Sequence, residues 1–219
     1  MDFFIDTANL DQIREAQDLG ILDGVTTNPS LMAREGIYGT EKVQEHYKKI
    51  CSLVDGPVSA EVISTERDAM VAEGIELFNL NPKQIVVKIP MTEDGLGAIK
   101  KLKDKNIPTN CTLVFSVSQA LLAAKAGATY VSPFVGRLDD ISSDGIQLIN
   151  QIRLVFDNYQ IDTLILAASI RNTRHVIDCA EIGSDVMTAP LKVFKMLIKH
   201  PLTDAGLEKF LADYNALKP

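Results

Sequence analysis

The chain has 219 residues, 46% hydrophobic and 23% charged, which is typical of a globular protein with one substantial core. A formal net charge of −7 without a basic stretch argues against a nucleic-acid-binding protein. No apolar stretch reaches the roughly 18 residues of a membrane-spanning helix, so we expect no membrane partner.

Targeting signals and metal motifs are also missing from the sequence. Residues 1–6 lack the basic region and the small-residue cleavage site of a signal peptide. The three cysteines are far apart and without CxxC spacing, which indicates neither disulfides nor a thiolate zinc site. No histidine has a partner at metal-ligand spacing, and we expect His46 and His175 at the surface. These features favour a cytoplasmic protein without a bound metal.

Strand-like and helix-like segments alternate along the whole chain. Short runs rich in β-branched residues predict strands at residues 3–6, 24–27, 58–63, 85–90, 109–114, 130–135, 164–168 and 186–188. Helical patterns lie at residues 10–19, 40–54, 66–79, 95–105, 118–125, 143–156, 173–182 and 191–198. Capping-box signals start two of these helices, at Thr65-x-x-Asp68 and at Ser116-x-x-Gln119.

The alternation predicts parallel βαβ units, and eight units in a chain of this length predict a closed barrel. The alternative is an open doubly wound sheet, which is expected to carry a glycine-rich phosphate turn after its first strand. Residues 6–9 read Asp-Thr-Ala-Asn and contain no glycine. We therefore predict an α/β fold of the TIM-barrel type, (β/α)8, in a single domain spanning residues 1–219.

A further helical pattern at residues 203–217 follows the eight helices of the barrel. Its apolar residues form one stripe, made of Leu207, Phe210, Leu211, Tyr214 and Leu217. Such a stripe needs a surface to cover it. The sequence leaves open whether this surface belongs to the barrel or to a neighbouring subunit.

Lys88 stands inside the most apolar predicted strand, residues 85–90 (IVVKIP). A buried ammonium is unfavourable unless it is paired, and burial favours the neutral amine. A neutral amine can attack a ketone and form a Schiff base, which serves as an electron sink for breaking the adjacent C–C bond. The alternative is a lysine that extends its ammonium to water from a strand end.

Polar residues accompany Lys88 near the ends of the other predicted strands, where barrel enzymes carry their active sites. Several lie two residues apart and therefore share one face of a strand. Singly, each is explained as a helix cap, a strand former, a core residue or a surface charge. Their common location favours a site made of Asp6, Thr26, Asn28, Glu61, Asn110, Thr112, Ser132, Phe134, Arg137, Ser169 and Arg171.

The chemistry of these side chains suits the cleavage of a sugar. Asp6 could move the proton of the hydroxyl at the bond being cut. Glu61 and Thr112 could hold a water that serves the proton transfers of imine formation. Asn28 and Asn110 could hydrogen-bond substrate hydroxyls.

A phosphate group on the substrate would need local positive charge in this acidic protein. Arg137 and Arg171, with Ser169 beside them, could bind it, because a guanidinium matches the oxygens of a phosphate. Cys111 is a poor candidate for a nucleophile, because strand alternation directs it to the face opposite Asn110 and Thr112.

Six segments of the sequence form a recognisable set: FFIDTAN (3–9), GVTTNPS (24–30), VVKIP (86–90), TNCTLVFS (109–116), SPFVGR (132–137) and AASIR (167–171). In these segments the chain resembles the transaldolase family, in the small branch that also contains fructose-6-phosphate aldolases. The resemblance runs in register from residue 3 to about residue 190. TTNPS together with VKIP at this separation is a specific signal, whereas neither motif is specific alone.

The resemblance implies a class I enzyme without a cofactor, in which Lys88 forms the Schiff base and Asp6 acts as acid and base. It implies transfer of a dihydroxyacetone unit from sedoheptulose 7-phosphate or fructose 6-phosphate to glyceraldehyde 3-phosphate or erythrose 4-phosphate, in the pentose phosphate pathway. Small family members resemble rings, typically decamers built from two pentamers, in which the C-terminal helix reaches a neighbour. A homo-oligomer is therefore implied as well.

Two positions separate the branches of the family. The aldolases tend to carry Gln at the position of Glu61 and Tyr at the position of Phe134, so this chain resembles the transaldolases. A fructose-6-phosphate aldolase of the same fold is the alternative. A non-catalytic barrel that binds sugar phosphates is an alternative of another class.

Overall fold

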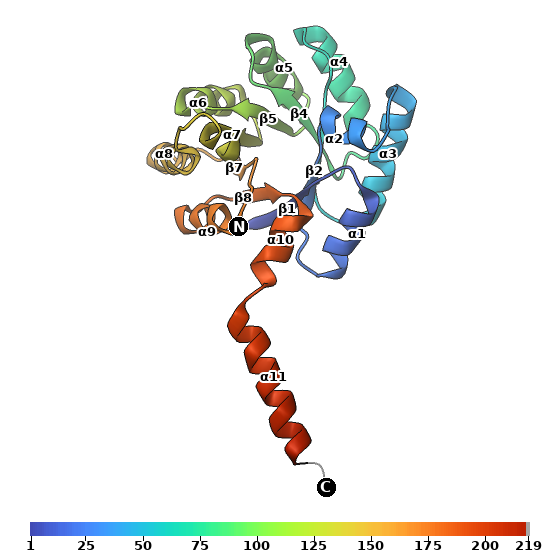
Figure 1. Ribbon diagram of the computed structural model, residues 1–219. Helices are drawn as coiled ribbons and strands as arrows, with labels where there is room; N and C mark the ends of the chain where they lie inside the picture. Colours follow the sequence, from blue (N-terminus) through green and yellow to red (C-terminus); the bar gives the residue numbers. More distant parts are fainter. Residues whose placement is uncertain (218–219) are drawn as a thin grey trace.

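The computed structural model describes residues 1–217, in which eight parallel strands close into a barrel in chain order (Figure 1). The strands are β1 (Asp2–Asp6), β2 (Gly24–Thr26), β3 (Val58–Glu61), β4 (Ile85–Pro90), β5 (Thr109–Val114), β6 (Tyr130–Pro133), β7 (Leu164–Ala167) and β8 (Val186–Ala189). β1 pairs with both β2 and β8, which closes the barrel. The predicted (β/α)8 fold is confirmed.

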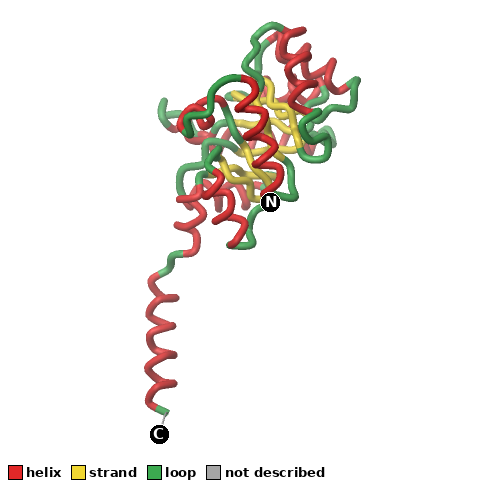
Figure 2. The backbone as a smooth tube through the Cα atoms, turned by 90° about the vertical axis from the view of Figure 1, so that its right-hand side faces the viewer, coloured by secondary structure: helices red, strands yellow, loops and turns green. Residues whose placement is uncertain are grey.

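Helices surround the barrel and one further helix leaves it (Figures 1 and 2). They are α1 (Leu10–Asp18), α2 (Pro29–Arg34), α3 (Thr40–Leu53), α4 (Arg67–Phe78), α5 (Glu93–Lys103), α6 (Val117–Ala126), α7 (Val135–Asp139), α8 (Gly145–Asn158), α9 (Thr173–Ile182), α10 (Leu191–Ile198) and α11 (Pro201–Ala216). No helix in the described part of the chain has both the length and the apolar character of a membrane span.

Two short helices, α2 and α7, were not predicted. α2 begins with Pro29 at its first position, and the Asn28 side chain accepts the N–H of Leu31, which is a recognisable helix start. α7 starts at Val135, where the sequence predicted the end of a strand. Both helices are too short to show an apolar period.

The two predicted capping boxes have different outcomes. The Ser116 hydroxyl accepts the N–H of Gln119, as predicted for the start of α6. Thr65 does not cap α4, because the cap residue is Glu66 and it makes no side-chain cap hydrogen bond. The Glu73 carboxylate instead accepts the N–H groups of Ile63 and Ser64, which holds the loop before the helix.

The expected surface positions of two histidines are wrong. His46 is buried on the inner face of α3, where its Nε2 lies 2.6 Å from the backbone oxygen of Ala8. His175 is half-buried, and its Nε2 lies 3.1 Å from a carboxylate oxygen of Asp139. Both rings therefore tie a helix to an adjacent segment, which helical periodicity did not reveal.

One end of the barrel interior is closed by apolar side chains. Phe4, Leu166 and Val186 form a buried cluster, with Tyr130 packed against it. Gly24 makes room for this cluster, since a Cβ there would lie 2.6 Å from the ring of Phe4. Polar side chains follow this plug along the strands, toward their carboxyl ends.

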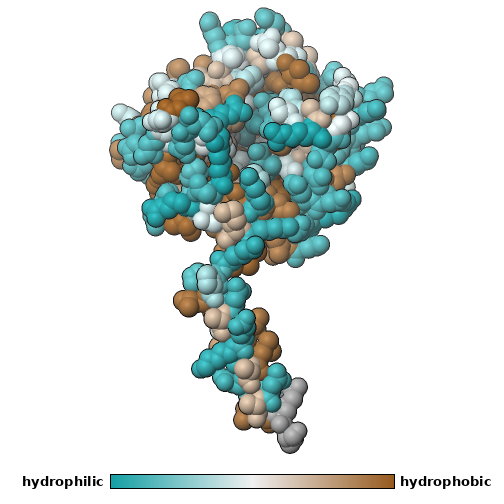
Figure 3. All heavy atoms as spheres, viewed as in Figure 1, coloured by the Kyte–Doolittle hydropathy of each residue, from teal (hydrophilic) through white to brown (hydrophobic). Residues whose placement is uncertain are grey.

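α11 projects away from the barrel instead of packing on it (Figures 1 and 2). None of its residues is buried, and Leu207 and Phe210 are 59% and 71% exposed. Figure 3 shows apolar residues along this helix between polar ones. The sequence left open whether the apolar stripe of this helix packs on the barrel of its own chain or on a neighbouring subunit. In the structure, the barrel of the same chain does not cover the stripe.

Candidate active site

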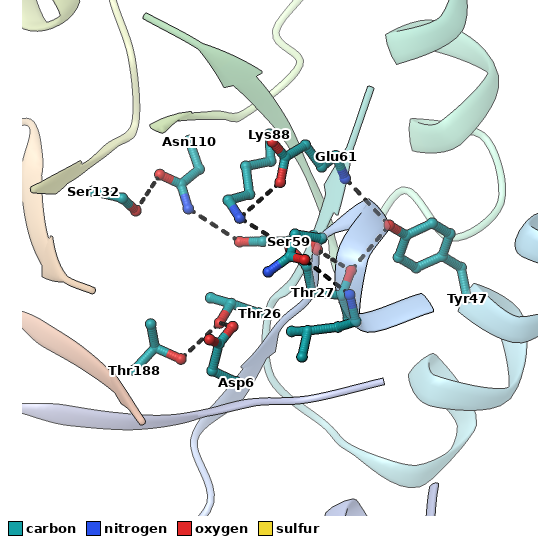
Figure 4. A network of polar contacts seen from close by, with 12 residues as sticks. Asp6, Thr26, Thr27, Tyr47, Ser59, Glu61, Lys88, Asn110, Ser132 and Thr188 are labelled. Carbon is teal, nitrogen blue, oxygen red and sulfur yellow. Dashed lines mark hydrogen bonds and ion pairs between the residues drawn. The ribbon is translucent and has the colours of Figure 1, made fainter. Parts of the chain in front are cut away.

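Lys88 ends inside the barrel, not in water (Figure 4). Only 5% of the residue is exposed, although it carries an ammonium. Its Nζ donates to the backbone oxygen of Thr27 at 3.0 Å and lies 2.9 Å from Oε2 of Glu61. Glu61 and Lys88 are direct neighbours in the pairing of β3 with β4, so the register of the sheet creates this ion pair. The alternative of a lysine that extends to solvent is wrong.

Asp6 lies at the end of β1 beside Thr26, its partner in β2. The Thr26 hydroxyl donates to Oδ1 of Asp6 at 2.8 Å. Burial raises the pKa of Asp6 above its ordinary value, because desolvation disfavours the carboxylate. The positive charges of Lys88, Arg137 and Arg34 oppose this rise without overcoming it. Asp6 therefore holds a proton more readily than an exposed aspartate does.

Three polar side chains form a second buried chain of hydrogen bonds (Figure 4). Ser132 donates to Oδ1 of Asn110 at 2.7 Å, and Nδ2 of Asn110 donates to the Ser59 hydroxyl at 3.3 Å. Asn110 is therefore held by its neighbours on both sides of its amide. The Thr112 hydroxyl is buried and has no hydrogen-bond partner within the described chain. A buried orphan hydroxyl of this kind is unusual and suits a bound water or substrate.

A small pocket of about 100 Å³ opens above these groups. Its lining consists of Asp6, Thr26, Asn28, Lys88, Ser132, Phe134, Arg137, Ala168, Ser169 and Thr188. A larger hollow of about 590 Å³ lies outside the barrel, between α6 and residues 159–162. None of the predicted catalytic groups lines that hollow, so the pocket at the strand ends is the candidate active site.

Arg137 is held in the pocket wall by the loop geometry around α7. Its guanidinium lies 4.7 Å from the centre of the Phe134 ring, within the range of a cation–π contact. The preceding residue, Gly136, donates its N–H to the backbone oxygen of Ser169. A Cβ at Gly136 would lie 2.4 Å from that oxygen, so only glycine allows α7 to approach the end of β7 this closely.

Arg171 is not brought into the pocket lining. Its guanidinium binds both carboxylate oxygens of Asp140, with Nη2 and Oδ2 2.6 Å apart. The hydrogen bond from Arg171 lowers the pKa of Asp140. Of the two arginines predicted to bind one phosphate, only Arg137 lines the pocket, whereas the guanidinium of Arg171 is bound to Asp140.

Cys111 is no candidate nucleophile, as expected. It is fully buried, and its Sγ lies 3.6 Å from the sulfur of Met91. Burial raises the pKa of its thiol to about 12. Groups of three or more metal-binding side chains are likewise not found in residues 1–217.

Comparison with known proteins points to one family. The profile of the transaldolase/fructose-6-phosphate aldolase family matches residues 3–218. Probable transaldolases of Cytophaga hutchinsonii and Phocaeicola vulgatus are each 65% identical to this chain over 214 residues, covering 98% of both chains. A probable transaldolase of Porphyromonas gingivalis is 64% identical, covering 98% of this chain and 97% of its own.

The chain belongs to the transaldolase/fructose-6-phosphate aldolase family. The family, the barrel fold and the transaldolase class of enzyme, all predicted from the sequence, are confirmed.

Most residues that the sequence predicted for a transaldolase site lie around the pocket. Eight of them line it: Asp6, Thr26, Asn28, Lys88, Ser132, Phe134, Arg137 and Ser169. Four do not line it: Glu61, Asn110, Thr112 and Arg171. Glu61 nevertheless contacts Lys88 through the ion pair, and Asn110 is hydrogen-bonded to Ser132, which lines the pocket.

The sequence reasoning missed three residues beside Lys88 or the pocket, which are Thr27, Tyr47 and Thr188. Thr188 lines the pocket, and its hydroxyl oxygen lies 2.6 Å from that of Thr26. Tyr47 is buried in α3, where its hydroxyl contacts that of Thr27 at 2.9 Å and accepts the N–H of Glu61. No signal singled them out, because threonine is common in strands and tyrosine is common in the apolar face of a helix.

Proposed function

We propose that this transaldolase carries a dihydroxyacetone unit on Lys88. The observation that supports the proposal best is the buried Lys88 amine, which faces the pocket and contacts the Glu61 carboxylate at 2.9 Å. Full-length relatives at 65% identity bear the name probable transaldolase. The donor is a ketose phosphate, fructose 6-phosphate or sedoheptulose 7-phosphate. The acceptor is an aldose phosphate, erythrose 4-phosphate or glyceraldehyde 3-phosphate.

In the first step, the Schiff base forms. Glu61 takes a proton from Nζ of Lys88, and the free amine attacks the ketone carbon of the donor. A second proton moves from the attacking nitrogen to the former ketone oxygen, which gives the carbinolamine. The proton on Glu61 then goes to this hydroxyl, which leaves as water, and the protonated imine remains. The Thr112 hydroxyl, which lacks a partner in the described chain, is available to hold this water.

In the second step, the carbon–carbon bond breaks. Asp6 takes the proton of the hydroxyl on the carbon at the far end of the breaking bond from the imine. This carbon becomes the aldehyde of the first product, and the electrons of the bond move into the imine. The first product leaves as an aldose phosphate, and an enamine of dihydroxyacetone stays on Lys88. The raised pKa of Asp6 suits this role, since the same carboxyl must later return the proton.

In the third step, the enamine attacks the aldehyde of the acceptor, and the first two steps run in reverse.

Arg137 and Ser169 in the pocket wall bind the phosphate of the substrate. Arg171 joins them only if it releases Asp140. Thr26, Asn28 and Ser132 bind or orient the hydroxyls from the rest of the lining.

A fructose-6-phosphate aldolase is the second candidate function. The pocket wall carries Phe134, which has no hydroxyl to protonate the enamine. The enamine therefore persists until an acceptor aldehyde binds. This favours transfer of the dihydroxyacetone unit over its release as free dihydroxyacetone.

The test is the release of glyceraldehyde 3-phosphate from fructose 6-phosphate, with and without erythrose 4-phosphate. Release that depends on erythrose 4-phosphate supports a transaldolase, and equal release without it identifies an aldolase. Borohydride treatment with fructose 6-phosphate, read by mass spectrometry, should place the adduct on Lys88, with Lys88→Met as the control. A wild-type chain without an adduct would instead be a binding barrel.

We also propose that the chain is a homo-oligomer in which α11 packs on a neighbouring subunit. The exposed stripe that includes Leu207 and Phe210 supports this arrangement. The resemblance to ring-shaped family members suggests a decamer of two pentamers, with each chain forming one domain in the cytoplasm.

Light scattering after gel filtration tests the oligomer. Leu207→Ser with Phe210→Ser should lower the particle mass. Lys209→Gln, a change at a polar position of the same helix, should leave it unchanged. An unchanged mass for the double variant would show that α11 does not hold the assembly together.

A further inference from the structure

Thr188 lines the pocket and is connected through Thr26 to Asp6, the proposed acid and base. It lies on β8, on the opposite side of β1 from Thr26 on β2. Thr188 is 3% exposed, and its Oγ1 lies 2.6 Å from Oγ1 of Thr26 (Figure 4). Thr26 in turn contacts Asp6, so three side chains from three adjacent strands form one line.

The direction of the hydrogen bonds follows from counting protons. A threonine hydroxyl has one proton to donate and lone pairs to accept with. Thr26 gives its proton to the ionised Asp6, which can only accept. The contact at 2.6 Å must therefore be donated by Thr188. The order is Thr188 to Thr26 to Asp6.

We propose that Thr188 is a positioning residue for the transaldolase reaction, whose hydroxyl keeps Thr26 oriented as the donor to Asp6. Oδ1 of Asp6 is then occupied, and Oδ2 takes the proton of the substrate hydroxyl. The inference rests on the proposed function of Asp6 as acid and base. It adds a residue on β8 to a site built from the other strands.

Two physical effects give Thr188 its influence. A hydroxyl that accepts a hydrogen bond is a stronger donor in its own bond, so Thr188 strengthens the bond from Thr26 to the Asp6 carboxylate. Thr188 also stops Thr26 from turning its proton away from Asp6, because Thr188 occupies the acceptor side of the Thr26 hydroxyl. Without Thr188, the ionised form of Asp6 is less stabilised.

The pH dependence then has a defined sign. The charged groups that act on Asp6 are Lys88, Arg137 and Arg34, and Thr188→Val changes none of them. A weaker bond to the carboxylate raises the pKa of Asp6 further. Asp6 must be ionised to take the substrate proton, so activity at acid pH is lost earlier and the acid limb of the kcat profile moves to higher pH.

The experiment compares Thr188→Val with Thr188→Ser, which keeps the hydroxyl. Thr188→Val has nearly the same shape as threonine, and Thr188→Ala removes the hydroxyl without a branched side chain if the valine variant folds poorly. The assay is fructose 6-phosphate cleavage with erythrose 4-phosphate between acid and neutral pH. We expect the variants without a hydroxyl to lose five- to tenfold in kcat, about the effect of one hydrogen bond, with little change in KM.

Three further readouts separate positioning from a merely structural role. The acid limb should shift in Thr188→Val and not in Thr188→Ser. The rate of borohydride trapping on Lys88 in Thr188→Val should equal that of the wild type, because imine formation does not use Asp6. A wild-type kcat and acid limb in Thr188→Val would overturn the inference, as would an equal loss in Thr188→Ser.

Asp6→Asn distinguishes failure of the inference from failure of the proposed function. If Asp6→Asn still cleaves the donor at the wild-type rate, the role of Asp6 itself is wrong. If Asp6→Asn is inactive while Thr188→Val behaves as wild type, only the role of Thr188 is wrong.

Discussion

The ion pair between Lys88 and Glu61 predicts a specific pattern of stability. Only 6% of the Lys88 side chain and 14% of the Glu61 side chain are exposed, and their charged atoms lie 2.9 Å apart. At an effective dielectric constant of about 20, two unit charges at this distance attract each other by about 6 kcal/mol. Most of this attraction only offsets the desolvation of the two groups.

Removal of one partner should therefore cost more than removal of both. We expect Lys88→Met and Glu61→Gln each to lower the free energy of unfolding by about 2 kcal/mol, because each leaves a charge that has lost its partner. Because Glu61 keeps some contact with solvent, the free energy of unfolding should fall by less than it would for a fully buried ion pair. The double variant should lose only about 1 kcal/mol, so the coupling between the sites is about 3 kcal/mol.

The assay is urea unfolding at pH 7 and one protein concentration, followed by far-ultraviolet circular dichroism. The matched control is the exposed pair of Lys195 and Glu15, whose charged atoms lie 2.5 Å apart. The variants Lys195→Met and Glu15→Gln should be additive, since exposed pairs contribute little. Additivity within about 0.5 kcal/mol at Lys88 and Glu61 would refute the buried ion pair.

Four other outcomes follow from the structure. Asp6→Asn should slow cleavage by at least about 100-fold, the usual contribution of a general acid or base. As pH rises above 3.8, the ionisation of Asp6 should cost the wild type stability, because its pKa is raised in the folded state. The free energy of unfolding of Asp6→Asn should therefore increase relative to that of the wild type over this range, and urea titrations that show no such increase would contradict this. Glu61→Gln with Phe134→Tyr should raise acceptor-independent release of glyceraldehyde 3-phosphate by about tenfold or more, because a tyrosine hydroxyl can protonate the enamine; an unchanged rate would exclude this explanation of the branches. Burial raises the thiol pKa to about 11 at Cys51 and to about 12 at Cys111 and Cys179. A disulfide reagent at pH 8 should therefore react at least about 10²-fold more slowly with the native chain than with the unfolded chain, and rapid labelling of the native chain would contradict this.

The repeating order of strands and helices was predictable from the sequence. β4 and β5 have the predicted bounds. The closed barrel followed from the number of units and from the missing phosphate turn. Strands β3 and β6 end earlier than predicted, since apolar residues beyond a strand end continue the pattern without continuing the pairing.

Much of the candidate site was predictable for a geometric reason. The carboxyl ends of all parallel strands meet at one face of a barrel, so polar residues at strand ends converge wherever they lie in the sequence. Asp6 was identified in this way, whereas Lys88 was identified as a charge inside an apolar strand, and both line the pocket.

Only the tertiary structure decided which partner each polar group takes. Arg171 binds Asp140 and stays out of the pocket lining, while Thr188 joins Thr26 across β1. These pairs are 31 and 162 residues apart in the chain, and they depend on distances of less than 3 Å that no local pattern encodes. The sequence determined where the chemical groups gather, because strand ends are local features. The fold decided their hydrogen bonds, because these form only after the barrel has closed.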